Sequence, residues 1–299
     1  MRKDLLAPYL DTLRQRALPE GGFTFQSGKS HRPDGTAWAV LAFQLTGVDR
    51  LLLKSARDRL AAEQLEDGRV PVSPEEPQAF WPTPLAIYAW YGSKSHRDPL
   101  SRAIQFLLET QGSHPARNPD SPLGHDTSIL GWPWVADTHS WIEPTSHALL
   151  ALRLARKAAH QRARDAISMI LDRQLPNGGW NYGNTSVFDE VLRPMPETTG
   201  MALDALAGSV SEHRIESSLH ILEKDAEHLR TPLALAWSVL GLGAWNRRPH
   251  LAQEWIQTVL ERQKLYGPYD TALLSLLLIA FCARGGLRET IVRGECRSE

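Results

Sequence analysis

Apolar and polar positions along the chain form two kinds of helical segment. Six segments are apolar nearly all round, which is typical of buried helices, and each begins at or near a threonine: Thr36, Thr83, Thr145, Thr199, Thr231 and Thr271. A more polar, amphipathic segment precedes each of them, with its charges on one face as expected of an outer helix: residues 5–15, 51–64, 100–111, 162–174, 214–224 and 251–263. No strand pattern competes, so the sequence predicts an outer and an inner helix repeated six times.

These six hairpins fill the chain from about Leu5 to Gly285, and no domain boundary is visible. The pattern predicts an all-α protein with a single domain over residues 1–299. Helical repeats can stay open as a solenoid, but six units with such apolar inner helices favour a closed (α/α)6 barrel, an α/α toroid. The repeated threonine is interpreted as the N-cap of each inner helix, and Pro84 and Pro232 follow it at the first helical position.

One turn carries a family resemblance. Residues Gln174–Tyr182 read Gln-Leu-Pro-Asn-Gly-Gly-Trp-Asn-Tyr, and weaker copies begin at Gln64 and Gln263. Together with the hairpin array, this turn resembles the prenyltransferase and squalene oxidase repeats of triterpene cyclases, of the squalene–hopene cyclase type, and of protein prenyltransferase β-subunits. The resemblance covers nearly the whole chain, although the squalene–hopene type has two barrels and this chain has one. It implies an α/α barrel and chemistry on a hydrophobic isoprenoid-type substrate.

The chain departs from the reaction motifs of these families. It has no two adjacent aspartates, so the Asp-x-Asp-Asp motif of protonating cyclases and the Asp-Asp-x-x-Asp metal motif are both missing. Neither Cys282 nor Cys296 follows an aspartate by two residues, as the zinc site of the prenyltransferases requires. Asp137, His139 and His147 have side chains that suit zinc or iron, but spacing alone is poor evidence. We therefore predict no metal and no cofactor.

Composition excludes several classes of protein. The 299 residues carry a formal net charge of −1, which disfavours a sequence-independent nucleic-acid binder. Two cysteines exclude a disulfide-rich scaffold. The N-terminus has no long apolar run, and the longest apolar stretch, residues 271–283, is too short to cross a bilayer. We expect a cytoplasmic protein with no transmembrane segment.

The connections between helices are asymmetric. Three links from an outer to an inner helix are long: Gly21–Gly35, Gly112–Pro144 and Asn177–Glu197. Long loops inside a compact domain are usually functional or disordered. All such links leave the rim at which the inner helices begin, and helix N-termini give that rim partial positive charge. The sequence therefore predicts that the mouth of a site lies there, with the three loops over a cavity.

The rim loops supply the candidate site residues. Four acids precede a repeated threonine by one or two residues, and each either complements a helix dipole or points into the barrel as an acid, a base or a cation stabiliser. Glu143 ranks first because it also lies in a tryptophan-rich loop, where burial would raise its pKa. The predicted catalytic set is Glu143, Asp137, His139, Glu197 and Asp34. The predicted substrate-binding set is Trp132, Trp134, Trp141, His147, Tyr182, Arg193 and Asp270.

The leading hypothesis is a terpene cyclase-like enzyme, an isomerase or lyase that uses acid–base and carbocation chemistry on a hydrophobic substrate in the barrel. Two alternatives stay open: a non-catalytic lipid- or isoprenoid-binding barrel, and a subunit of a complex like a prenyltransferase β-subunit. The expected partner is a hydrophobic small molecule rather than nucleic acid, and both a homodimer and a helical partner subunit remain compatible with the sequence.

Overall fold

The computed structural model describes residues 2–26, 28, 30–47, 50–118 and 120–294; Cys296 lies outside them. The six outer helices are α1 (Arg2–Gln15), α3 (Arg50–Ala62), α5 (Arg97–Glu109), α7 (Gln161–Asp172), α9 (Glu216–Ala226) and α11 (Ala252–Glu261). Six inner helices alternate with them: α2 (Pro33–Thr46), α4 (Pro82–Trp90), α6 (Ile142–Leu154), α8 (Pro196–Leu206), α10 (Pro232–Ala244) and α13 (Thr271–Cys282). Both sets match the helices expected from the sequence.

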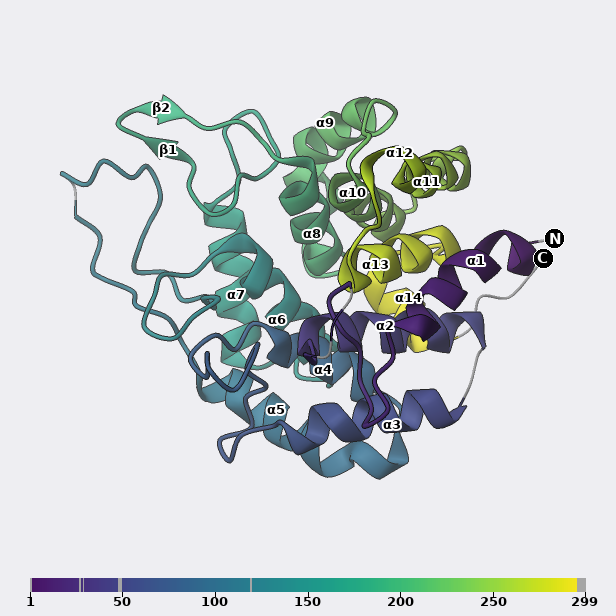
Figure 1. Ribbon diagram of the computed structural model, residues 1–299. Helices are drawn as coiled ribbons and strands as arrows, with labels where there is room; N and C mark the ends of the chain where they lie inside the picture. The colour runs from purple at the N-terminus through teal and green to yellow at the C-terminus, as the bar shows by residue number, and fades with distance from the viewer. Residues whose placement is uncertain (1, 27, 29, 48–49, 119, 295–299) are drawn as a thin grey trace.

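The inner helices form a closed ring (Figure 1). Each packs against the next in chain order, and α13 packs back against α2. The inner helices are buried nearly all round, whereas α5, α7 and α11 bury only one face. The predicted all-α (α/α)6 barrel is confirmed, because no edge remains between the first and last inner helices.

The repeated threonine has a different role from the predicted N-cap. Four of the inner helices begin one to three residues before it, so its side chain lies inside the first turn and the capping prediction is wrong there. The threonine hydroxyl instead accepts a hydrogen bond from a backbone N–H of the incoming loop. The pairs are Thr36 with Phe23 (2.8 Å), Thr83 with Val70 (2.9 Å), Thr145 with Trp132 (3.0 Å) and Thr199 with Trp180 (3.0 Å).

The last two threonines differ again. Thr231 is the N-cap residue of α10, but its side chain makes no capping hydrogen bond. Asp270 caps α13 instead, accepting from the N–H of Leu273 at 2.9 Å. The Thr271 hydroxyl donates to the carbonyl oxygen of Thr24 at 2.6 Å, and the Thr271 N–H donates to that of Phe25 at 2.7 Å. These bonds tie the first long loop to the last inner helix.

Two of the glutamine turns, after α3 and α7, join neighbouring hairpins. The Gln64 amide follows α3 and donates to the carbonyl oxygen of Pro99, in α5, at 2.9 Å. The Gln174 amide follows α7 and donates to the Ser218 hydroxyl, in α9, at 2.8 Å. A methyl group on Gly178 would overlap the backbone between residues 217 and 218, and its φ of 98° suits glycine. The Gln174 turn therefore requires a small residue where it touches the next outer helix.

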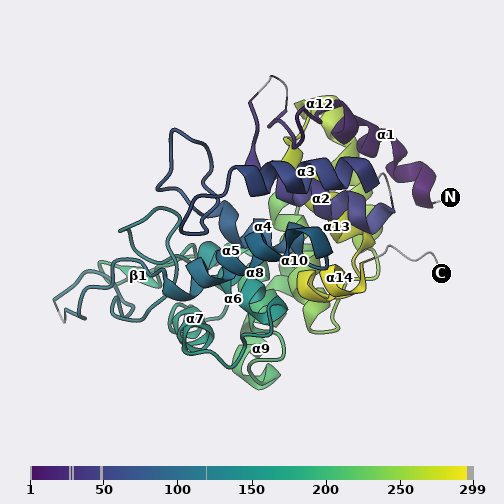
Figure 2. The same ribbon diagram turned by 90° about the horizontal axis from the view of Figure 1, so that it is seen from below.

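The long loops lie at one end of the molecule. The loop that follows α5 runs beside the hairpin of β1 (Ser186–Val187) and β2 (Glu190–Val191), as Figures 1 and 2 show. A β-bridge joins Leu123 to Val187, and another joins Ala79 to Val135. These two bridges join the connections that precede α4, α6 and α8, so three successive loops form one linked segment of the rim.

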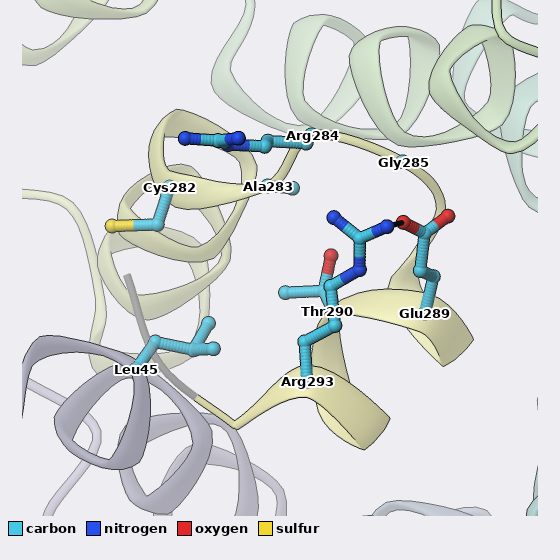
Figure 3. Close-up of a pocket in the computed structure, with 8 residues that line it drawn as sticks. All are labelled: Leu45, Cys282, Ala283, Arg284, Gly285, Glu289, Thr290 and Arg293. Carbon is cyan, nitrogen blue, oxygen red and sulfur yellow. Dashed lines mark ion pairs between the residues drawn. The ribbon is translucent and has the colours of Figure 1, made fainter. Parts of the chain in front are cut away.

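A short helix covers the opposite end of the barrel. Helix α14 (Leu287–Arg293) contacts α6 and α10. The carboxylate of Asp204, a buried residue of α8, accepts from the Leu287 N–H at 2.7 Å and fixes the start of α14. A cavity of about 360 Å³ lies beside α14 and is shown in Figure 3; its lining includes Leu45, Cys282 and Thr290. It belongs to the far end of the inner helices from the rim.

Three short helices complete the structure: η1 (Lys94–His96), η2 (Glu212–Ile215) and α12 (Gln263–Tyr266). Over the part of the chain described above, no helix is by itself long and apolar enough to cross a membrane. Helices α13 and α14 meet such a criterion only together, as a pair bent by 77°.

Candidate functional site

Three of the predicted acids occupy the same position in the repeat. Asp34, Glu143 and Glu197 are each the second residue of an inner helix, in α2, α6 and α8. Asp270 stands just before α13 as its cap. Because α6 packs on α8 and α13 packs on α2, the acids fall into two neighbouring pairs, and α4 and α10 separate the pairs around the ring.

The pair on α2 and α13 is neutralised by arginine. The Arg32 guanidinium donates to both carboxylate oxygens of Asp34, through Nε and Nη2, each at 2.9 Å. Arg16 lies near Asp270, although burial still raises the pKa of that carboxyl. Asp34 is 5% exposed and fully engaged by Arg32, so its geometry favours the interpretation as a structural charge at a helix N-terminus.

The pair on α6 and α8, hereafter the acid pair, has no such partner. Within the described ranges, neither Glu143 nor Glu197 forms an ion pair. Burial, and after it the nearby carboxylate of Glu197, raise the pKa of Glu143 from 4.5 to about 7. Both effects disfavour the ionised form of Glu143. A large fraction of Glu143 is therefore protonated at neutral pH, as a general acid needs to be.

Tyr182 holds the second carboxylate in place. Its hydroxyl donates to Oε1 of Glu197 at 2.8 Å, and this bond is the main cause of the raised pKa of Tyr182. The Tyr182 carbonyl accepts from the N–H of Ile142, the first residue of α6, at 2.9 Å. The third long loop thus connects α6 to α8 at the acid pair, and it brings together three of the predicted site residues.

An aromatic wall stands beside the start of α6. The rings of Trp134 and Trp141 stack with centroids 5.4 Å apart and planes 19° from parallel. His139 lies against Trp141, with centroids 5.8 Å apart. The two tryptophans are half-buried and His139 is exposed. Trp141 is the residue before α6, so this wall adjoins the acid pair and offers aromatic faces that attract a cation.

Besides Asp34 and Asp270, four predicted residues belong neither to the acid pair nor to the aromatic wall: Trp132, Asp137, Arg193 and His147. Trp132 is 1% exposed; its indole N–H donates to the Leu107 carbonyl at 3.1 Å, and the Arg162 guanidinium covers its ring. These contacts give Trp132 a core position. Asp137 and Arg193 are exposed, and Asp137 has a φ of 59° in the loop. His147 packs within a cluster of aromatic rings on the barrel axis.

That cluster, hereafter the axial cluster, comprises Trp38, Tyr88, His147 and Trp237, from α2, α4, α6 and α10. Its rings contact one another with centroids 5.4 to 6.3 Å apart. The Tyr88 hydroxyl donates to the His147 carbonyl at 2.8 Å. Burial lowers the pKa of His147 to about 3, so its imidazole is neutral.

The axial cluster limits the depth of the site. Its members stand five or six residues into their helices, which places them about 8 Å below the rim at 1.5 Å per residue. Aromatic rings from four of the six inner helices therefore fill the axis at that level. The sequence predicted a hydrophobic substrate in the barrel, and these rings occupy the interior of the barrel at that level.

Sequence reasoning missed the axial cluster as a unit. Trp38 and His147 both stand two residues after the repeated threonine, so their equivalence was available from the sequence, whereas Tyr88 and Trp237 follow their threonines by five and six residues. No group of three His, Cys, Asp or Glu side chains in the described parts of the chain is arranged to hold a metal ion.

Solved structures share this architecture. An α-1,6-mannanase of the GH76A type from Salegentibacter sp. HEL1_6 superposes with a TM-score of 0.63 at 13% identity, over 93% of this chain and 98% of that one. The type II terpene cyclase MstE from Scytonema superposes with a TM-score of 0.58 at 15% identity, over 93% and 98%. A protein from Actinoplanes superposes with a TM-score of 0.62 at 14% identity, over 97% and 99%.

No protein-family model and no curated protein matches the sequence. At 13 to 15% identity, the likeness to the solved structures concerns the fold. The chain therefore has the α/α-barrel fold shared by a terpene cyclase and a mannanase.

Proposed function

We propose that the protein is an acid–base enzyme of the terpene cyclase type, which acts on a hydrophobic isoprenoid-type substrate at the mouth of the barrel. The observation that carries this proposal is the Glu143 carboxyl group, half-buried at the start of α6 beside Glu197, with a pKa raised to about 7. The aromatic wall next to it supports the same chemistry. MstE, with the same fold, has been solved with geranylgeranyl dihydroxybenzoate as its substrate.

The proposed reaction begins with proton transfer. The O–H bond of Glu143 breaks, and the π electrons of a substrate alkene form a new C–H bond, which leaves a carbocation on the substrate. The stacked faces of Trp134 and Trp141, with the Glu197 carboxylate, stabilise that cation. The π electrons of a second alkene of the substrate then form the ring-closing C–C bond and move the positive charge to a new carbon. The reaction ends when a C–H bond next to that carbon breaks, its electrons form a C=C bond and its proton passes to Glu197, which Tyr182 orients. The proton returns from Glu197 to Glu143 before the next turnover. No oxidant or reductant is consumed.

A second candidate is glycoside hydrolysis, favoured by the composition of the acid pair. Glycosidases use one protonated and one ionised carboxyl group on either side of the scissile bond, and the acid pair has one member with a raised pKa. A stacked tryptophan pair also suits a sugar ring. The mannanase of the same fold supports this alternative, because its inactive variant was solved with α-1,6-mannotriose.

The test compares the wild-type protein with Glu143→Gln on linear isoprenoids and on oligosaccharides, with products identified by mass spectrometry. Glu254→Gln, at an exposed position of α11, is the matched control. We expect the wild type and the control to convert an isoprenoid, and Glu143→Gln to lose at least about 100-fold in turnover, the lower range for a general acid.

Each other outcome counts against the proposal. Conversion of oligosaccharides alone would replace the cyclase with the glycosidase. Full turnover by Glu143→Gln would remove Glu143 from the mechanism. No conversion of any substrate by the wild type would replace the enzyme with a non-catalytic isoprenoid-binding barrel, or with a prenyltransferase-β-like subunit if a stoichiometric partner copurifies.

A further inference from the structure

A second cavity lies within the long loop that follows α5, hereafter the loop cavity. It encloses about 350 Å³, and its walls come from residues within 113–118 and 120–127, from residues 139–141 and from two positions in the following repeat. Its lining includes Pro115, Leu123, His125, His139, Trp141 and Arg173. Neither Glu143 nor Glu197 lines it, so the loop cavity is separate from the acid pair.

One wall of the loop cavity carries an unsatisfied polar group. His125 is only 7% exposed, and its Nδ1 atom is buried with no hydrogen-bond partner among the described residues. The neighbouring His114 is different: its Nε2 accepts from the Gly131 N–H at 3.1 Å and pairs with the Ser140 hydroxyl at 2.7 Å. A buried polar atom without a partner is costly, and among the described side chains with such an atom His125 is the one that lines the loop cavity.

A buried cation, the guanidinium of Arg173, also lines the loop cavity. Arg173 is 4% exposed, and its Nη1 and Nη2 donate to the carbonyls of Gly183 and Asp126, at 2.6 and 3.2 Å. Its Nε donates to Asp172 at 3.2 Å, which leaves two of its five N–H groups for another acceptor.

Positive groups act on His125 in the loop cavity, although Asp120 also lines it. After burial, the charges of Arg173 and His139 are the main causes that lower the pKa of His125 to about 4, and Asp126 opposes them only in part. The same kind of effect lowers the pKa of His114, through Arg162, Arg173 and His139. A field that disfavours protonation of two histidines favours a bound anion.

We propose that the loop cavity binds a small organic carboxylate with an apolar body. The carboxylate oxygens accept from the guanidinium of Arg173 and from an imidazole N–H of His125, and the body packs on Pro115, Leu123 and the Trp141 ring. A carboxylate accepts from the two remaining N–H groups of Arg173 and from His125 at once, and hydrogen bonds from a guanidinium to a carboxylate are stronger than those to a neutral acceptor. The site does not depend on the proposed cyclase activity.

The test measures binding by isothermal titration calorimetry, with benzoate as the probe and with benzyl alcohol and inorganic phosphate as comparisons. We expect benzoate to bind, and to bind at least tenfold more tightly than either comparison. His125→Leu should lower the affinity for benzoate at least tenfold, and His220→Ala, at an exposed position of α9, should leave it unchanged. His125→Gln, which keeps a polar donor, serves if the leucine variant fails to fold, and should bind benzoate more weakly than wild type.

Three results would overturn the proposal. Equal binding of benzyl alcohol would show a neutral ligand site, and preferred binding of phosphate would show a site for inorganic anions. Absence of benzoate binding, or binding that the His125 variants do not change, would show that the loop cavity is a structural void. None of these results bears on Glu143, because turnover is not measured.

Discussion

Replacing Asp204 with asparagine should change how stability depends on pH. The Asp204 carboxyl is 2% exposed, and burial raises its pKa from 3.8 to about 7. Because the folded protein holds this proton more tightly than the unfolded chain, stability is lost as pH rises through the window between these two values. At about 1.4 kcal/mol per pKa unit, the loss attributable to Asp204 is about 4 kcal/mol in all, of which about 2–3 kcal/mol falls between pH 5 and pH 8.

The asparagine side chain of this variant has no charge to gain as pH rises, yet its oxygen still accepts from the Leu287 N–H that starts α14. We therefore expect the free energy of unfolding of Asp204→Asn, measured relative to wild type by urea denaturation, to shift in favour of the variant by about 2–3 kcal/mol from pH 5 to pH 8. Glu143 titrates in the same range but is common to both proteins. A difference that stays constant with pH would refute a raised pKa of the buried Asp204 carboxyl group at the base of the barrel.

Two further substitutions test the packing of the barrel. Thr145→Val removes the acceptor of the Trp132 N–H and should lower the free energy of unfolding by about 1–3 kcal/mol, whereas Thr145→Ser should retain most of it; equal urea midpoints for the two variants would contradict the assigned role. Gly200→Ala places a methyl group on the Trp237 carbonyl, where α8 and α10 meet, and should cost about 1–3 kcal/mol. A melting temperature equal to that of wild type would show that α8 and α10 can move apart at this contact without loss of stability.

The helices were predictable because local periodicity decides them. An inner helix is buried on all sides and an outer helix on one side. In both cases the spacing of apolar residues within the segment itself shows which faces are buried. The role of the threonine was not predictable. A threonine before a helix and one in its first turn look alike in sequence, and only the structure shows that Thr145 meets the N–H of Trp132, thirteen residues away.

The sequence predicted where the site residues lie, at the starts of the inner helices, but not the environment of each residue. Glu143 and Glu197 are 54 residues apart, but their shared place in the repeat brings them to adjacent helix starts. Their environments could not be inferred from the repeat. Arg32 neutralises Asp34, whereas Tyr182 reaches Glu197 from a loop whose path depends on contacts between distant segments. The filling of the axis by the axial cluster likewise depends on side-chain directions from four helices at once.

The proton on Glu143 is the central claim, and a carboxyl titration measures it without any substrate. The protein is labelled with ¹³C at the glutamate side-chain carboxyl carbons, and NMR spectra of wild type and Glu143→Gln are compared from about pH 4 to pH 9. We predict one carboxyl signal that titrates near pH 7 in the wild type and is missing from the variant. A Glu143 signal that titrates near the ordinary value of 4.5 would contradict the account, because the carboxyl would already be ionised at neutral pH.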